Sequence, residues 1–332
     1  MKVKDIGERG LLKRLHRYCP PEVVGDDAAI IPSTEGGKKL VVTADMLVDG
    51  VHFSDRTTSA RDAGWRAAAA NLSDIAAMGA SPMGIAIALG ITGDTEVDWV
   101  EELYQGIADC LEPYNTPIVG GDVARSPFIS ISITAFGEVA ADRAILRSNC
   151  RSGNVIVATG SHGSSRAGLE LLLNPALGQH LTEAERRFLV RAHQRPRPRL
   201  DVLSVLWSSV ESQSKILIGG MDSSDGLADA IVQMCRASKV GARIDRNLLP
   251  TDSALNKLVD RDTALDWALY GGEDFELVLS MPAKVGEELV AKIGEGAAIV
   301  GTTTSDTDIL LTDSQGIHSQ EELTQRLAFQ HF

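Results

Sequence analysis

The chain has 332 residues, of which 44% are hydrophobic and 23% are charged, and its formal net charge is −13. This length exceeds what a single hydrophobic core usually serves, so we expect two domains. The negative charge argues against a nucleic-acid-binding surface, and the four cysteines form no C-x-x-C pair that would indicate a zinc site. Because residues 1–10 show no signal-peptide pattern and no apolar run reaches 18 residues, we expect a cytoplasmic protein without a membrane segment.

The first half of the sequence alternates between helical and strand patterns. Ser59 followed by Asp62 is typical of a helix start and predicts an alanine-rich helix that runs to Ala77 and ends at Gly79. A second helix is expected to begin at Thr95. A further short helix is predicted at 6–18, and strands are predicted at 39–44, 83–91, 117–119 and 128–136, the last from its alternation of apolar and mostly polar residues. These elements predict a first domain over residues 1–145.

The second half has the same mixed character and predicts a second domain over residues 146–332. Strands are predicted at 154–159, 216–218, 242–245, 275–279, 298–301 and 309–311. Helices are predicted at 165–173, from 182 onward, and at 200–210, 227–234, 253–259, 263–269 and 285–293. The basic, proline-marked segment 195–199 is interpreted as a connector. The fold class is therefore α/β (α+β).

The stretch 219–226 reads as a tight turn between a strand and a helix, and it carries Asp222 and Asp225 among glycines and hydroxyls. At helical spacing, two carboxylates three residues apart share a face and could reach one ligand. Bare carboxylates 4 Å apart would repel by about 4 kcal/mol at an effective dielectric near 20, and a divalent cation removes that cost. The simpler alternative is that Ser223 or Ser224, with Asp222, only caps the helix.

The same chemistry recurs elsewhere in the chain, where aspartates stand at element ends or beside small residues. These segments contain Asp26 and Asp27, Thr43 and Asp45, Asp74, and Asp122. A fold that brought them together would form an oxygen-rich site for several Mg²⁺ ions, because Mg²⁺ takes carboxylates, waters and substrate phosphates. Asp74 would lie in the last turn of its helix, where the helix dipole disfavours an anion, so a metal partner is indicated there.

Several common catalytic motifs are missing from the sequence. There is no G-x-x-x-x-G-K-[ST] phosphate loop, no G-x-S-x-G elbow and no H-E-x-x-H pair. His162, His180 and His193 are interpreted as packed or surface histidines. The remaining aspartates, arginines and glycine turns suit phosphoryl transfer, in which positioning and charge neutralisation supply most of the catalysis.

Taken together, these motifs resemble the thiamine-monophosphate kinase family, in the superfamily that includes aminoimidazole ribonucleotide synthetase. The resemblance covers essentially the whole chain. It rests on Gly25-Asp26-Asp27, Thr43-Ala44-Asp45, Val51-His52-Phe53, the stretch 71–80 with its Asn-Leu-Ser-Asp start, Gly120-Gly121-Asp122, Asp222-Ser223-Ser224-Asp225-Gly226-Leu227, Gly271-Gly272-Glu273-Asp274-Phe275-Glu276-Leu277 and Phe329-Gln330-His331-Phe332.

The resemblance implies Mg²⁺-dependent direct in-line transfer of a phosphoryl group from ATP to thiamine phosphate. It implies as metal ligands Asp27, Thr43, Asp45, Asp74, Asp122, Asp222 and Asp225. It implies as ATP contacts Tyr104, Gly121, Asp122, Arg147 and Ser224, with Arg147, Asp222 and Asp225 in catalytic roles. It implies as thiamine-phosphate contacts His52, Glu273 and Phe329.

The family resemblance also implies a two-domain aminoimidazole ribonucleotide synthetase-like fold and a homodimer in which the N-terminal sheets of two chains form a barrel. Two alternative functions remain open from the residues. One is an ATP-dependent amidine-forming ligase of the purine-pathway type, which would use the same aspartates with another acceptor. The other is a non-catalytic Mg-nucleotide-binding regulator. The near-complete aspartate set argues against the regulator.

Overall fold

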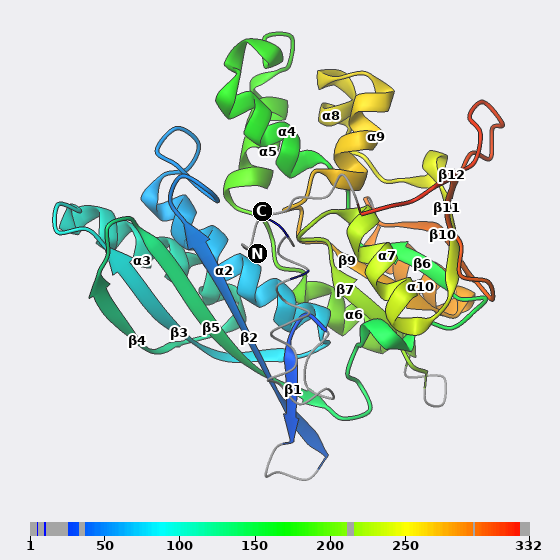
Figure 1. The fold of residues 1–332 in the computed structure, drawn as a ribbon, viewed down its shortest axis with the longest axis horizontal. Helices are drawn as coiled ribbons and strands as arrows, with labels where there is room; N and C mark the ends of the chain where they lie inside the picture. The colour runs from blue at the N-terminus through cyan, green and yellow to red at the C-terminus, as the bar shows by residue number, and fades with distance from the viewer. Residues whose placement is uncertain are drawn as a thin grey trace.

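The computed structural model describes residues 5, 10, 26–32, 37–210, 216–294 and 296–325. Two mixed sheets, each with its own helices, form the described part of the molecule (Figure 1). The helix expected at 6–18 falls mainly outside the described residues. Among those described, no helix is both long enough and apolar enough to cross a membrane.

The first sheet has five strands in the order β1-β2-β5-β3-β4. They are β1 (Ala29–Pro32), β2 (Lys38–Val48), β3 (Ser81–Ile91), β4 (Ile118–Arg125) and β5 (Ser130–Ala140). β3 and β4 are parallel, and the other neighbours are antiparallel. The alternation predicted for β5 is confirmed, because Ile131, Ile133 and Ala135 are fully buried while their neighbours are not.

Two helices, α2 (Ala60–Ala77) and α3 (Val97–Leu111), cover the inner face of this sheet (Figure 1). The expected start of α2 is confirmed, because the Ser59 hydroxyl accepts a hydrogen bond from the Asp62 amide at 3.2 Å. The glycines and alanines of α2 allow a close approach to α3. A Cβ on Gly64 would lie 2.0 Å from the Leu103 carbonyl oxygen, so only glycine fits there. Thr95 does not cap α3, whose preceding residue is Glu96.

The second sheet has seven strands in the order β12-β11-β8-β10-β6-β9-β7. They are β6 (Val155–Ala158), β7 (Gly219–Asp222), β8 (Gly241–Asp245), β9 (Leu277–Met281), β10 (Ala298–Thr304), β11 (Ile309–Thr312) and β12 (Glu321–Glu322). One face packs against α7 (Leu227–Ser238), and the other against α6 (Leu200–Val210) and α10 (Ala283–Ile293).

Four further helices form a separate layer at the top of Figure 1. They are α4 (Ser164–Leu173), α5 (Glu183–Gln194), α8 (Ser253–Leu258) and α9 (Arg261–Tyr270). The helix start predicted at Thr182 is confirmed, because Thr182 and Glu185 form a capping box at the start of α5. Short 3-10 turns complete the described chain: η3 (Glu112–Tyr114), η4 (Arg147–Asn149), η5 (Pro175–Gly178) and η6 (Arg246–Leu248).

The end of α2 joins the two halves of the molecule. Ala76, Ala77 and Ile145 belong to the same buried cluster as α6, α10 and the second sheet. Leu146 forms a parallel bridge with Gly219 at the start of β7. The last turn of α2 is therefore held against β7, which places the aspartates of two distant segments side by side.

Two expected strands differ from the structure in ways that affect the site. The strand expected at 216–218 lies instead at Gly219–Asp222, because Gly219 and Gly220 pair with Ser280 and Leu279 of β9. Asp222 is thus the last residue of a strand, and α7 begins only at Leu227, so Asp222 and Asp225 do not share a helical face. The strand expected at 117–119 continues through Gly120, Gly121 and Asp122 as β4.

Candidate active site

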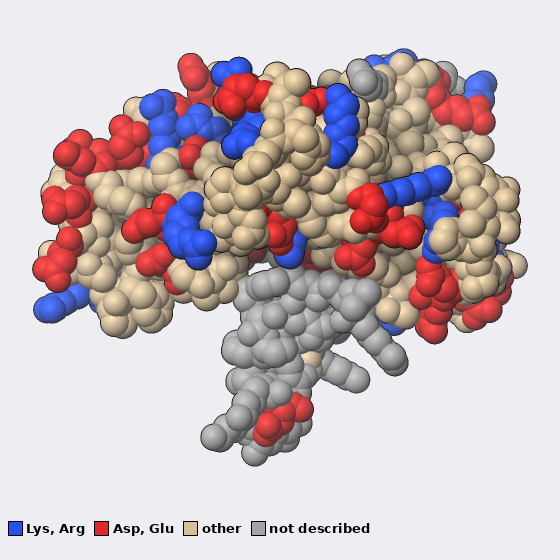
Figure 2. Space-filling view, turned by 90° about the horizontal axis from the view of Figure 1, so that it is seen from above, with Lys and Arg blue, Asp and Glu red and all other residues tan. Residues whose placement is uncertain are grey.

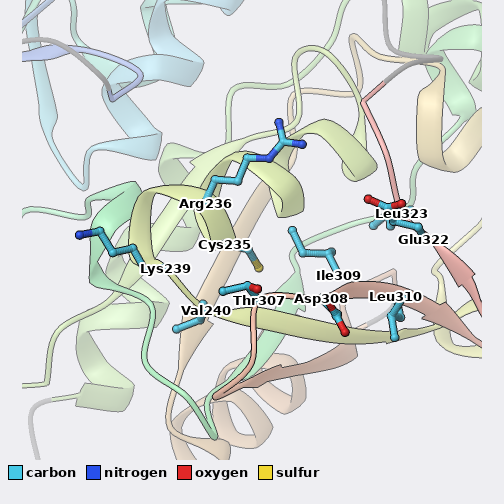
Figure 3. Close-up of a pocket in the computed structure, with 10 residues that line it drawn as sticks. All are labelled: Cys235, Arg236, Lys239, Val240, Thr307, Asp308, Ile309, Leu310, Glu322 and Leu323. Atoms are coloured by element: carbon cyan, nitrogen blue, oxygen red, sulfur yellow. The ribbon is translucent and has the colours of Figure 1, made fainter.

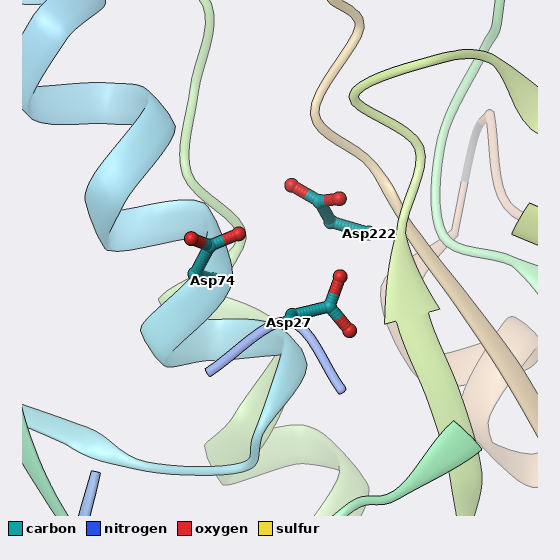
Figure 4. A group of neighbouring side chains, drawn as sticks. All are labelled: Asp27, Asp74 and Asp222. Carbon is teal, nitrogen blue, oxygen red and sulfur yellow. The ribbon is translucent and has the colours of Figure 1, made fainter. Parts of the chain in front are cut away.

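Three carboxylates from separate parts of the chain point toward one another (Figure 4). Asp27 lies just before β1, Asp74 lies in the last turn of α2, and Asp222 ends β7. One oxygen atom of each lies within 4.8 Å of the others. The packing of α2 against β7 brings Asp74 to Asp222.

Electrostatics shows how costly this grouping is without a cation. Burial, opposed by the Arg147 charge, raises the pKa of Asp27 from 3.8 to about 7. Burial and the charge of Asp222 raise the pKa of Asp45 on β2 to about 6. Burial, with Asp45, Asp222 and Asp27 nearby, raises the pKa of Asp74 well above its ordinary range.

The donor set of this cluster fits a divalent cation. Oδ2 of Asp27 is buried and makes no hydrogen bond. A buried carboxylate oxygen without a partner is costly, and a metal ion would satisfy it while neutralising the grouped charge. All three side chains offer oxygen, the ligand that Mg²⁺ prefers.

Neighbouring polar groups hold the carboxylates in place. Ser73 Oγ donates to Asp222 Oδ2 at 2.6 Å, and Ser224 Oγ donates to Asp222 Oδ1 at 2.8 Å. The Thr43 hydroxyl donates to Asp74 Oδ2. Sequence reasoning assigned no separate role to Ser73, although it directly precedes Asp74 in a recognisable motif. Its signal in the sequence was its place in the Asn-Leu-Ser-Asp stretch 71–74.

Arg147 lies beside this cluster in η4. Its Nη2 donates to Asp27 Oδ1 at 2.9 Å, and its backbone N–H donates to Asp26 Oδ1 at 2.6 Å. The side chain is 17% exposed, and Nε is buried with no hydrogen-bond partner. The predicted ATP-contacting arginine therefore lies next to the acidic cluster, and one of its N–H groups makes no hydrogen bond.

A second group of predicted residues meets around an arginine that the sequence reasoning missed. Arg66 Nη2 donates to the Glu273 carboxylate at 2.5 Å and to the carbonyl oxygen of His52 at 3.3 Å. Nη1 of the same buried arginine donates to the backbone oxygen of His193. Glu273 adopts a left-handed backbone with φ of 58°, which costs free energy.

His193, whose backbone oxygen accepts from Arg66, has a neutral side chain. Burial, together with the adjacent Arg66, lowers the pKa of His193 to about 3, so its 3.7 Å approach to Glu273 is not an ion pair. The structure thus brings His52 and Glu273 together through one arginine. The signal in the sequence was an arginine directly before the alanine run 67–70 of α2.

Other predicted residues are not members of the three-carboxylate group. Asp225 is half-buried in the turn after β7 and is not one of the three grouped carboxylates. Gly121 and Asp122 are exposed on β4, which lies three strands from β2, about 14 Å at the usual strand spacing. Tyr104 lies on α3. Phe329 lies outside the described residues.

Some cavities of the described structure lie elsewhere, and the two described next contain none of the predicted site residues. A hollow of about 440 Å³ between the end of α7 and β11 is lined by Arg236, Lys239, Asp308 and Glu322, with Cys235 among the lining residues (Figure 3). A larger hollow of about 1010 Å³ includes Arg199, whose charge is paired with Glu276.

Acidic side chains gather at the end of the molecule where α3 lies (Figure 2).

The sequence matches two known domain types in succession. Residues 25–139 match the AIR synthase related protein, N-terminal domain, and residues 151–322 match the C-terminal domain of the same family.

The similarity to known proteins extends over most or all of the chain. The thiamine-monophosphate kinase of Synechococcus elongatus is 46% identical over 330 residues, which cover 99% of this chain and 98% of that protein. The thiamine-monophosphate kinase of Escherichia coli is 37% identical over 259 residues, covering 78% and 76%. The solved structure of AaThiL complexed with AMPPCP and TMP has a TM-score of 0.85, with 29% identity and coverage of 100% and 99%.

Proposed function

The chain belongs to the AIR synthase related family, and from this premise we propose that it transfers a phosphoryl group from ATP to thiamine phosphate. The products are ADP and thiamine diphosphate. The observation that carries this proposal is the 46% identity to a thiamine-monophosphate kinase over 99% of the chain. The fold agrees, because the similar AaThiL was solved with an ATP analogue and TMP.

The acidic cluster is the proposed metal-binding part of the enzyme. Asp27, Asp74 and Asp222 would hold Mg²⁺, with Thr43 and Asp45 beside them on β2. When bound, the metal supplies charge neutralisation for the phosphate oxygens. The chain's own contribution is to preorganise these carboxylates through the hydroxyls of Ser73 and Ser224, and to keep bulk water away by burial.

Arg147 is the proposed contact to the phosphates of ATP. A guanidinium group is always charged and presents several donors in a fixed plane, so it can hold phosphate oxygens while one Nη stays on Asp27. Ser224 stands in the turn directly after the metal-binding Asp222.

The group around Arg66 is the proposed binding site for the acceptor. Glu273 offers a carboxylate to the cationic thiazolium ring. Arg66, which donates to that carboxylate, also donates to the carbonyl oxygen of His52. Because Arg66 fixes the Glu273 side chain before substrate arrives, less conformational entropy is lost on binding. Phe329 would add a cation–π contact, as predicted from the sequence.

The phosphoryl group passes directly from ATP to the acceptor in this proposal. The grouped aspartates are committed to metal, and the buried cysteines Cys110, Cys150 and Cys235 are poor nucleophiles because burial raises the pKa of each thiol. These reduced, buried thiols also suit the cytoplasm, where we place the enzyme.

A homodimer would explain the residues that lie apart from the cluster. β4 is an exposed edge strand, and Val119 and Val123 on it are 60% and 57% exposed. Apolar side chains on an open edge favour association with another sheet. We propose that a second copy covers this strand, which would carry Gly121 and Asp122 into the interface.

An assay of ADP release tests the proposed function. The enzyme is incubated with ATP and either thiamine phosphate or formylglycinamidine ribonucleotide, with and without Mg²⁺. We expect ADP and thiamine diphosphate only with thiamine phosphate and Mg²⁺. ADP formed with the ribonucleotide instead would identify an amidine-forming ligase, and ATP binding without turnover would identify a regulator.

A further inference from the structure

We propose that Gln233 is a positioning residue that holds the Arg147 guanidinium with a neutral oxygen and so keeps its positive charge available to ATP. The proposal rests on the proposed function, because it takes Arg147 as a contact to the nucleotide phosphates. Its basis is a continuous hydrogen-bonded chain that runs from the acidic cluster along α7. It reaches the proposed ATP contact at Arg147.

The chain begins where Arg147 meets α7. Arg147 Nη1 donates to Gln233 Oε1 at 2.7 Å, while Nη2 donates to Asp27 Oδ1 at 2.9 Å. The carbonyl oxygen of Arg147 accepts from Ser238 Oγ at 2.7 Å, five residues further along α7. The residue is therefore fixed at its backbone and at two of its three guanidinium nitrogens, and only Nε is buried without a partner.

The orientation of the Gln233 amide is set by Asp229. The two residues are four apart on α7, so their side chains share a face of the helix. Gln233 Nε2 donates to Asp229 Oδ2, and an ionised carboxylate can only accept hydrogen bonds. The amide nitrogen is therefore turned toward Asp229, which leaves the carbonyl oxygen turned toward Arg147.

Asp229 is itself held from the other side. It is fully buried, and its Oδ1 accepts from Gln325 Nε2 at 2.8 Å. Gln325 Oε1 in turn accepts from Arg236 Nη1 at 2.7 Å. Each amide in this chain has its donor end on Asp229 and its acceptor end on an arginine. Reversing Gln233 would place its donor against Arg147, so one arrangement is strongly favoured.

The neutral character of Gln233 matters because Arg147 already contacts one carboxylate. A second carboxylate at position 233 would hold the guanidinium equally well in space but would offset its charge. It would also place two like charges at four-residue spacing, with Asp229 fully buried. A glutamine gives the same hydrogen bond without either effect. The effect of Gln233 on the position of the Arg147 guanidinium can therefore be tested separately from the effect of an added charge.

The experiment compares Gln233→Glu and Gln233→Met with the wild-type enzyme. The Michaelis constants for ATP and thiamine phosphate are measured, and the affinity for the non-hydrolysable analogue AMPPCP with Mg²⁺ is measured by calorimetry. Asn174→Asp is the matched control, because Asn174 is an exposed amide that also donates to a carboxylate four residues away, on Glu170. Thermal melting is recorded for each protein.

We expect Gln233→Glu to weaken ATP and AMPPCP binding by about tenfold or more, since a second carboxylate on Arg147 weakens its charge-assisted bonds to phosphate. Gln233→Met, which releases one guanidinium nitrogen but adds no charge, should weaken it by about threefold. Neither variant should change the Michaelis constant for thiamine phosphate by more than about twofold, a change worth only about 0.4 kcal/mol. Asn174→Asp should match the wild type throughout.

Unchanged AMPPCP affinity in Gln233→Glu would overturn the proposal, as would equal weakening of both substrates, which would indicate a general structural role. If Gln233→Glu does not fold, Gln233→Met decides alone, and wild-type ATP affinity in that variant overturns the proposal. The AMPPCP measurement needs no acceptor, so its outcome is separate from a failure of the wild-type enzyme to phosphorylate thiamine phosphate.

Discussion

Replacing Asp222 with asparagine should abolish most of the activity and yet stabilise the metal-free protein. Asp222 is fully buried, and its oxygens accept from Ser73 and Ser224. Asparagine has nearly the same shape, and its amide can donate to the Ser73 hydroxyl in place of accepting from it. The substitution therefore removes charge without leaving a buried polar group unpaired.

The size of the stability effect follows from the geometry of the cluster. Two carboxylate charges within 4.8 Å of each other repel by at least about 3.5 kcal/mol at an effective dielectric near 20. Because the pKa of Asp27 is raised to about 7, its carboxyl is partly protonated near neutral pH and only part of this repulsion is present. We expect Asp222→Asn to gain about 1–2 kcal/mol of unfolding free energy without Mg²⁺.

Turnover should move in the opposite direction. Removing one charge that neutralises a cation near the transferring group should lower kcat at least about a hundredfold, or about 2.7 kcal/mol. The assays are urea unfolding with and without Mg²⁺, and ADP release with thiamine phosphate. Addition of Mg²⁺ should stabilise the wild type more than the variant. Near-normal turnover in Asp222→Asn, or equal stabilisation of both proteins by Mg²⁺, would refute the metal-site reasoning.

Three further predictions address pH, the covalent path and assembly. The pKa of Asp27 is about 7 in the folded protein and 3.8 in the unfolded chain, so between these pH values the folded protein binds the additional proton. The free energy of unfolding without Mg²⁺ should therefore fall as the pH rises from 3.8 to about 7. Melting between pH 5 and pH 8 measures this, and Asp27→Asn should flatten the profile. Labelled ATP without acceptor should leave no phosphate on the protein, and a trapped phosphoenzyme would contradict direct transfer. Val123→Asp, on the exposed edge strand β4, should shift the protein to monomers in light scattering, whereas an unchanged mass would exclude this surface from the interface.

The sequence by itself determined most of the elements and the family. Alternation predicted β5, and the capping signals at Ser59 and Thr182 predicted where α2 and α5 begin. These signals are local, because a side chain that caps a helix lies within three residues of the amide it accepts from. The motif stretches, which carry local chemistry, indicated the same family that the domain matches show.

Only the tertiary structure decided which aspartates lie together. Asp27, Asp74 and Asp222 are separated by 47 and 148 residues along the chain, and they meet because the end of α2 packs into the second half beside β7. Asp225, only three residues from Asp222, is not part of this group. Distance along the sequence carries no information about contacts made by packing between elements.

The same reason explains the residues that the sequence did not reveal. Arg66 reads as one charge in an alanine-rich helix, and Gln233 reads as a polar position on an amphipathic one. Each acquires its role from a partner more than 80 residues away along the chain. Arg66 donates to Glu273, and Gln233 accepts from Arg147. A buried hydrogen bond depends on the spatial position of both partners, and that position exists only once the two sheets and their helices have packed.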